Sequence, residues 1–360
     1  MTLPLDLRRD EAAEALRERG VPHRRVEAWK YSDLRSVIGA EQIKAAGAAK
    51  WELETRSGEV ELFDLAGERA PDWAKRYIGA SPGGVMGMAS LAYARTGFAL
   101  RVRKAAAVSV VFPTAGQARV LIVLEDGATL DYREAARGDG FQNIGVDVVI
   151  GKDAHFTHAR LAAATPGVRI EDVAASVAAR GSYRLHTANF GAQLSRLELQ
   201  IALTGEAASA HLSGVSVLGG AAHADVTTHI DHAVGNTAST QLFKHVVGGK
   251  GRAVYQGKIT VREGANGSDS RQTAKALLLD ERAEADLKPE LEIFADDVKC
   301  AHGAAVGDLD ADSLFYLRAR GIPEAEARRL LMRAFLEEAL MGVENDETRA
   351  WLWSAVEEAL

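Results

Sequence analysis

The stretch 288-KPELEIFADDVKCAHGAAVG-307 holds the clearest fold signal in this chain of 360 residues, and it contains the only cysteine. Within it, residues 291–294 and 298–302 are typical of two short β-strands separated by an acidic turn. Side chains on a strand alternate between its two faces, so Cys300 and His302 are expected to point to the same side. The stretch therefore predicts a strand that presents a thiol and an imidazole together.

Turn signals recur at a steady interval upstream of this stretch. They lie 14 to 16 residues apart, at Gly191, Gly205, Gly220, Gly235, Gly251, Asn266, Glu281 and Asp296. A short period with a β-rich unit in each repeat is typical of a solenoid, whose rungs stack around one continuous core. We predict a parallel β-helix over residues 101–304, with one repeat in each rung. An ordinary β-sandwich is the alternative, because its strands also recur at short intervals.

The regions on either side of the predicted solenoid have a different pattern. Residues 1–100 alternate between helical and extended signals, which favours a mixed or helical N-terminal region whose fold the sequence leaves open. Residues 305–360 contain three helical patterns, at 312–320, 323–341 and 348–360. These predict a C-terminal helical domain that covers the last exposed rung, since a solenoid needs a cap at each end.

Composition places the chain among ordinary globular proteins. It is 47% hydrophobic and 26% charged, and its net charge of −7 gives no reason to expect nucleic acid or a membrane surface as a partner. The first ten residues include four charged side chains and no apolar run could cross a bilayer, so a cytoplasmic protein is expected. A single cysteine agrees with a reducing compartment. It also means that the chain by itself cannot supply the four thiolates of an iron–sulfur cluster.

Two groups of residues are candidates for metal binding. Cys300 and His302 offer a thiolate and an imidazole, which suit zinc, copper or iron–sulfur chemistry, but two ligands do not complete a site. A packed thiol beside a hydrogen-bonded histidine is the plainer interpretation. The second group is the run 223–232, which has three histidines, and His229 and His245 are expected to be neighbours because they are one period apart. A structural ladder of polar side chains is favoured over a metal site there.

Residues 296–307 and 314–322 resemble the signature of the SufB/SufD family of iron–sulfur cluster assembly proteins. The resemblance is close over about residues 225–340. Within the family the chain resembles the SufD type, because SufB-type chains are longer, carry more cysteines and have His-Glu-Ala where this one has His302-Gly303-Ala304. Further stretches that fit the family are 27–31, 231–232, 257–259, 265–272, 277–279 and 288–293.

The resemblance implies a mainly β fold, with a right-handed parallel β-helix between an N-terminal mixed or helical region and a C-terminal helical region. It implies a scaffold without catalytic activity that pairs with a SufB-like subunit through the β-helix and binds a SufC-like ATPase through its C-terminal helices. A transient iron ion or iron–sulfur cluster would lie at the SufB interface, where His302 and, less firmly, Cys300 would share it with the partner. The isolated chain is then expected to hold no cofactor stably, while homodimer formation and flavin binding by the complex stay open.

The apolar stripe and the arginines of the C-terminal helices are the predicted ATPase docking surface. Its residues are Leu314, Phe315, Leu317, Arg318, Arg320, Leu331 and Phe335. Two other classes of protein stay open as alternatives. One is an autonomous metal-binding β-helix that uses the run 223–232, and the other is a carbohydrate-active β-helix enzyme with carboxylates along a groove.

Overall fold

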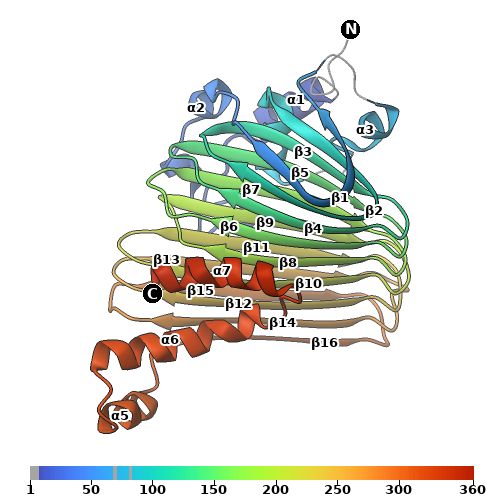
Figure 1. Ribbon diagram of the computed structural model, residues 1–360. Coiled ribbons are helices and arrows are strands. Elements are labelled where there is room, and N and C mark those ends of the chain that lie inside the picture. The colour runs from blue at the N-terminus through green and yellow to red at the C-terminus, as the bar shows by residue number, and fades with distance from the viewer. Residues whose placement is uncertain (1–7, 68–70, 81–82) are drawn as a thin grey trace.

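The computed structural model describes residues 8–67, 71–80 and 83–360, and a parallel β-solenoid makes up most of it (Figure 1). From β3 onward, each strand pairs with the strand two positions along the chain, and β2 (Gly97–Phe112) pairs with both β3 and β4. The even-numbered strands therefore form one face and the odd-numbered strands the other, with β2 belonging to both. The even face continues with β4 (Thr129–Ala136), β6 (His155–Ala162), β8 (Ser182–Asn189), β10 (Ser209–Leu218), β12 (Ala238–Val247), β14 (Asp269–Leu278) and β16 (Lys299–Gly307). The odd face has β3 (Gly116–Leu124), β5 (Phe141–Ile150), β7 (Val168–Val177), β9 (Leu194–Leu203), β11 (His223–His232), β13 (Arg252–Val261) and β15 (Glu284–Ile293).

A full turn of the solenoid takes two of the repeats seen in the sequence. Ala210 pairs with Tyr183 on one side and with Ser239 on the other, so its ladder neighbours are 27 and 29 residues away. The predicted fold class is confirmed, with about eight turns, but the prediction of one repeat in each rung is wrong. The turn signals mark both ends of a flattened rung, and their spacing therefore measures half a turn.

The same geometry overturns the expected contact between His229 and His245. His229 lies on β11 and pairs with Gln200 and Lys258, whereas His245 lies on β12, on the opposite face. Residues one repeat apart are separated by the core. Only residues two repeats apart lie above one another.

The core fills the space between the two faces. Every residue of β3 is buried, because its inward side chains meet the opposite face and its outward ones are covered as well. Leu121 and Val123 on the outer side pack against Ala74 and Ile78 of the N-terminal region. Burial on both sides explains the continuous apolar run of this strand. Each large aliphatic side chain so buried contributes about 1.5–3 kcal/mol to folding.

The N-terminal region packs over the start of the solenoid. Trp29 is 1% exposed, and the guanidinium carbon of Arg196 lies 4.0 Å from its ring centroid. Arg196 also donates a hydrogen bond to the Ala28 carbonyl over 2.8 Å, so the stretch 27–31 is held on the outer side of β9. The elements here are α1 (Arg9–Arg19), η2 (Glu27–Trp29), η3 (Leu34–Ser36), α2 (Ala40–Ala45), β1 (Glu52–Asp64), α3 (Asp72–Tyr77) and α4 (Val85–Tyr93), with β1 antiparallel to β2.

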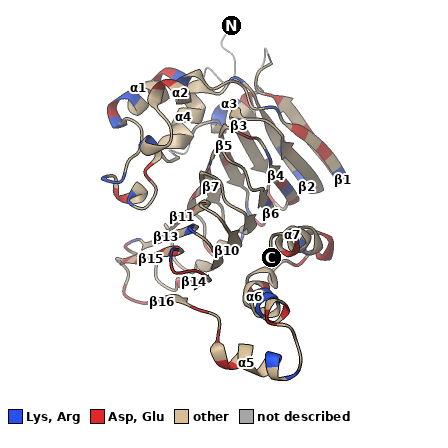
Figure 2. Cartoon of the chain, turned by 90° about the vertical axis from the view of Figure 1, so that its left-hand side faces the viewer, with Lys and Arg blue, Asp and Glu red and all other residues tan. Residues whose placement is uncertain are grey.

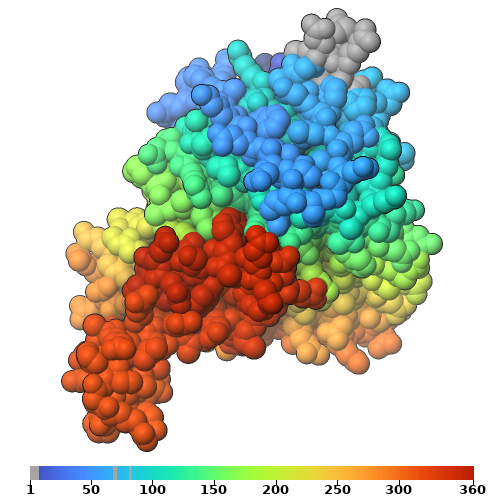
Figure 3. Space-filling view, in the orientation of Figure 1, coloured from blue at the N-terminus to red at the C-terminus, as the bar shows by residue number. Residues whose placement is uncertain are grey.

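The C-terminal helices lie beside the solenoid instead of over its end. Helix α6 (Glu324–Leu340) packs on β10 and β12, and α7 (Asp346–Ala359) packs on β6 and β8. Figure 2 shows both helices beside the solenoid. The smaller helix α5 (Ala311–Ala319) projects from the body of the molecule (Figure 3). The expectation that these helices cover the last rung is therefore wrong, because their apolar sides are buried against the even face. In the described part of the chain, no helix is long and apolar enough to span a bilayer.

Candidate functional site at the open end of the solenoid

The last rung of the solenoid consists of β15 and β16. They are the two ends of the strand order, so among the described residues each has one edge without a neighbouring strand. In β14 the inward side chains of Ser270 and Gln272 are 0% and 1% exposed. Directly below them in register lie Cys300 and His302, of which Cys300 is half-buried and His302 exposed. The inward face of the last rung is thus open to solvent.

Apolar side chains accompany the two candidate ligands at this end. Ile293 is 42%, Phe294 63% and Val306 47% exposed. Exposed large apolar groups beside unpaired strand edges are unusual on a monomer and typical of a surface that binds another chain.

Cys300 is partly withdrawn from solvent. Its side chain packs against a small cluster that contains Ile259 and Val261. Burial raises the pKa of the Cys300 thiol, the negative charge of Asp269 raises it further, and a backbone hydrogen bond from Ser270 opposes both. His302, two residues on, is the more accessible of the two.

A hydrogen-bonded network stands above His302 inside the solenoid. Gln272 Nε2 donates to Tyr255 Oη over 2.9 Å, and Tyr255 Oη donates to Gln241 Oε1 over 3.0 Å. Gly257 makes room for this contact, because a Cβ at that position would lie 1.6 Å from Gln272 Nε2 and 2.4 Å from Tyr255 Oη. The network holds the rung that His302 stacks against.

A second chain of polar contacts stands above Cys300. His232 Nε2 lies 2.9 Å from Ser239 Oγ, which lies 2.8 Å from Ser270 Oγ. The sequence interpretation missed both networks. Ser270 and Gln272 lie 30 residues, or two repeats, before Cys300 and His302. This spacing is the sequence signal that could have identified them.

The histidines of the run 223–232 do not come together. His229 Nε2 lies 3.0 Å from Thr260 Oγ1, and His223 Nε2 lies 3.2 Å from Ser32 Oγ. Within the described residues, none of them belongs to a group of three close metal-ligating atoms. This arrangement agrees with the favoured structural ladder.

The predicted docking residues separate into two groups. On α5, Phe315 is 73% exposed, Leu314 and Leu317 are half-buried and Arg318 is exposed, as is Arg320 directly after the helix. On α6, Leu331 is half-buried, while Phe335 packs against the solenoid with the Lys244 amine 4.5 Å from its ring centroid. The accessible part of the predicted surface is therefore on α5.

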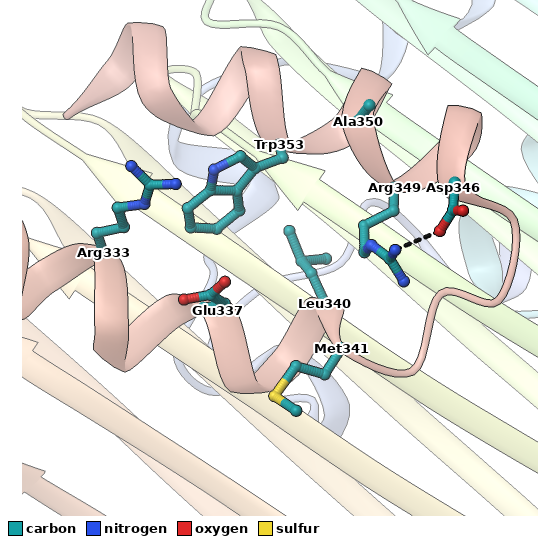
Figure 4. Close-up of a pocket in the computed structure, with 8 residues that line it drawn as sticks. All are labelled: Arg333, Glu337, Leu340, Met341, Asp346, Arg349, Ala350 and Trp353. Atoms are coloured by element: carbon teal, nitrogen blue, oxygen red, sulfur yellow. Dashed lines mark hydrogen bonds and ion pairs between the residues drawn. The ribbon is translucent and has the colours of Figure 1, made fainter.

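A pocket of about 530 Å³ lies between α6 and α7 (Figure 4). Met341 at its edge is 71% exposed, and an ion pair between Arg349 and Asp346 borders one side. The lining residues are Arg333, Glu337, Leu340, Met341, Asp346, Arg349, Ala350 and Trp353. The pocket lies on the helical side of the molecule, and neither Cys300 nor His302 lines it.

The solenoid thus has an open end that presents one thiol and one imidazole, and a helix that projects from its body. Comparison with known proteins indicates the class to which the chain belongs. The family model for the SufBD core domain of SUF system FeS cluster assembly matches residues 106–335. The chain therefore belongs to the SufBD family of iron–sulfur cluster assembly proteins, as the sequence resemblance predicts.

Individual relatives cover different parts of the chain. An iron–sulfur cluster assembly SufBD family protein of Synechocystis is 34% identical over 250 residues, which are 65% of this chain and 55% of the relative. The iron–sulfur cluster assembly protein SufD of Escherichia coli is 39% identical over 153 residues, which are 42% of this chain and 36% of the relative. A SufBD family protein of Mycobacterium tuberculosis is 27% identical over 361 residues and 94% of this chain. The chain thus spans about half the length of the first two relatives, or less.

Proposed function

We propose that this chain is a SufD-like scaffold subunit without catalytic activity of its own. In this proposal it pairs with a SufB-like subunit through the open end of the solenoid and holds a SufC-like ATPase on α5. The observation that carries the proposal is the position of His302 and Cys300 on the inward face of the last rung. A subunit that closed this end would place its own side chains against both.

The unpaired edges support a protein partner at this end. A strand edge leaves backbone N–H and C=O groups without partners, and a strand of a second chain can satisfy them. The exposed Ile293, Phe294 and Val306 would be buried by the same contact. A second copy of this chain could also cover the surface, and a homodimer of the isolated chain is therefore an outcome that the experiment below separates.

The number of ligands supports a shared site. Iron in a cluster needs four ligands, and this end offers one thiol and one imidazole. Two or more positions would be filled by the partner or by sulfide. The isolated chain would then bind iron weakly, with His302 as the main ligand because Cys300 is the less accessible of the two.

A contact between α6 and the solenoid could link the ATPase to this site. Lys244 on β12 is 3% exposed, and its amine donates to the Phe335 carbonyl over 2.6 Å and to the Glu338 carboxylate. Strand β12 pairs with β14, which pairs with β16. A movement of α6 would therefore be transmitted from β12 to β14 and from β14 to β16, which belongs to the last rung.

Reconstitution tests the proposal. The chain is mixed with a SufB-like subunit and a SufC-like ATPase from one organism, and complex formation and bound Fe²⁺ are measured. The complex should bind Fe²⁺ well and the isolated chain weakly, and His302→Ala should reduce binding by the complex by about tenfold or more. His211→Ala is the matched control, because His211 lies on the side of the solenoid with its Nδ1 2.8 Å from Thr240 Oγ1.

Three results would contradict the proposal. If the isolated chain binds Fe²⁺ as tightly as the complex, the autonomous metal-binding alternative is favoured. If no complex forms and the chain is a homodimer, the open end binds a second copy of this chain. If His302→Ala forms the complex and still supports cluster assembly, the last rung is an interface without a ligand role.

A cytoplasmic location is part of the proposal, and fractionation of cells tests it.

A further inference from the structure

A cluster of ionisable groups lies inside the solenoid, far from the open end. Glu134 on β4, His158 on β6 and Glu171 on β7 are each 1% exposed. Strands β4 and β6 belong to one face and β7 to the other, so the cluster bridges the core. Strand β16 lies five strand spacings from β6, which is roughly 24 Å at the usual strand spacing. The cluster is therefore separate from Cys300 and His302.

Within the described part of the chain, each of these three side chains has one polar atom with a hydrogen-bond partner and one without. Among the described residues, Glu134 Oε1, His158 Nε2 and Glu171 Oε1 have no hydrogen-bond partner. One ligand atom from each residue lies within 4.8 Å of the others. The other polar atom of each side chain has a partner. Tyr132 Oη donates to Glu134 Oε2 over 3.4 Å, and Arg160 Nε donates to Glu171 Oε2. His158 Nδ1 lies 3.1 Å from Tyr183 Oη.

The two carboxyl groups of the cluster are close together and buried. Burial raises the pKa of Glu171 to about 7 and raises that of Glu134 as well, and the positive charge of Arg160 only partly opposes this effect. Arg160 bonds to Glu171, while Arg169 donates to Gln142 and to a backbone carbonyl. Two carboxyl groups this close and this deeply buried are stabilised either by a proton that they share or by a metal ion bound between them.

We propose that Glu134, His158 and Glu171 bind a divalent transition-metal ion inside the solenoid. Two carboxylate oxygens and one imidazole nitrogen form a donor set that suits Zn²⁺, Mn²⁺, Fe²⁺ or Co²⁺. Tyr183 Oη can accept a hydrogen bond from Nδ1 of His158, the role that a carboxylate, a backbone carbonyl or water usually has for a metal-bound histidine. Burial also lowers the pKa of His158 to about 4, so its imidazole is neutral at neutral pH, and the tautomer that donates from Nδ1 to Tyr183 has its lone pair on Nε2.

A proton shared by the two carboxyl groups is the competing arrangement. It would satisfy Glu134 and Glu171 but leave His158 Nε2 without a partner in a closed interior, at a cost of about 1–3 kcal/mol. A metal ion would instead be coordinated by all three atoms that have no hydrogen-bond partner, Glu134 Oε1, His158 Nε2 and Glu171 Oε1. Because the guanidiniums of Arg160 and Arg169 are near, the metal displaces carboxyl protons as it binds. Displacing two protons leaves the charge of the cluster unchanged, and displacing one shared proton raises it by one.

The surroundings assign the ion a structural role. His158 stacks on Phe156 with ring centroids 5.6 Å apart and meets Tyr132 edge-on at 5.2 Å. These aromatic rings close the site, so the metal enters while the chain folds. Once bound, it joins the even face to the odd face at β7.

Refolding in the presence of Co²⁺ tests this inference on the full-length chain. The Cys300→Ala/His302→Ala double variant is the background, so that metal at the open end is not counted. After refolding and treatment with chelator, we expect about one Co²⁺ per chain, visible as d–d absorption and released on unfolding. Glu171→Gln and Glu134→Gln in this background should each lose it. Thr187→Val, which removes only a hydroxyl 3.5 Å from Arg160 Nη1, should keep it.

Two outcomes would overturn the inference. The first is a background variant that refolds, as judged by circular dichroism, without retaining Co²⁺, Zn²⁺ or Mn²⁺, which assigns the cluster to a shared proton. The second is retention of the ion by both glutamine variants. If one glutamine variant does not fold, the other and the background still decide the question.

Discussion

His302 lies directly below Gln272 in the parallel ladder that joins β14 to β16. Gln272 belongs to the last closed turn and is 1% exposed, whereas His302 belongs to the open rung. The step from a buried amide to an exposed imidazole marks the point where the solenoid ends. It also makes the packing above His302 part of the site that we propose.

Gly257→Ala should destabilise the solenoid near this site. The new Cβ would overlap with Gln272 Nε2 and Tyr255 Oη, and relieving this overlap breaks the hydrogen bond between them. We expect a loss of about 1–3 kcal/mol in the free energy of unfolding, measured by urea denaturation. Gly303→Ala on β16 is the control, because no atom lies within 4 Å of its Cβ position. Equal stability of both variants would show that the network is not tightly packed.

Asp269→Asn should make the thiol of Cys300 more reactive. The carboxylate of Asp269 helps to raise the pKa of this thiol, so removing its charge lowers the pKa and increases the thiolate fraction at a given pH. The rate of modification by a disulfide reagent near pH 8 measures the change, and the single cysteine makes the signal unambiguous. Glu263→Gln, on an exposed turn, should leave the rate unchanged. An unchanged rate in Asp269→Asn would contradict the electrostatic explanation.

Reversing the charges of Arg318 and Arg320 should weaken capture of the SufC-like ATPase. Both arginines are exposed on or next to α5, and the Arg320 guanidinium carbon lies 4.6 Å from the ring centroid of Tyr316. Pull-down of the ATPase measures the effect, with reversal of Lys250 and Arg282 on exposed turns as the control. The solenoid should keep its melting temperature in both variants. Unchanged capture would limit α5 to a role within this chain.

His245→Leu should stabilise the protein and reduce its sensitivity to acid. His245 is 1% exposed with both ring nitrogens unpartnered within the described residues, and burial lowers its pKa to about 4. A folded-state pKa below the unfolded value of 6.5 means that wild-type stability falls as the pH drops from about 6.5 towards 4. Leucine has no group that takes up a proton when the protein unfolds. The free energy of unfolding of the variant should therefore depend less on pH in that window.

A gain of about 1 kcal/mol at neutral pH is expected for His245→Leu, because an unsatisfied buried polar group is removed. His211→Leu is the control, since that imidazole already has a hydroxyl partner and its loss should bring no gain. A steeper pH dependence in His245→Leu would mean that His245 is charged in the folded protein.

Local patterns in the sequence carry a large part of the fold. The regular turns predict a solenoid because each turn depends on residues that are adjacent in the chain. The alternation of a strand likewise places Cys300 and His302 on one side of β16. The residues around them also indicate the SufBD family, which the comparison confirms.

Other features depend on pairing between distant strands. The repeat is half a turn because β10 pairs with β8 and β12 and not with its neighbours in sequence, and a period alone does not say which strands pair. The helices α6 and α7 lie beside the solenoid because apolar residues of the even face cover their inner sides.

The sequence by itself therefore determined the repeating β-unit, the strand with its thiol and imidazole, and the family, since each rests on neighbouring residues. The tertiary structure decided which side chains meet across the core. Glu134 and Glu171 are 37 residues apart and lie on opposite faces, and Gln272 reaches His302 only through the ladder. Such contacts are set by register and by the closing of the two faces, and register is a property of paired strands.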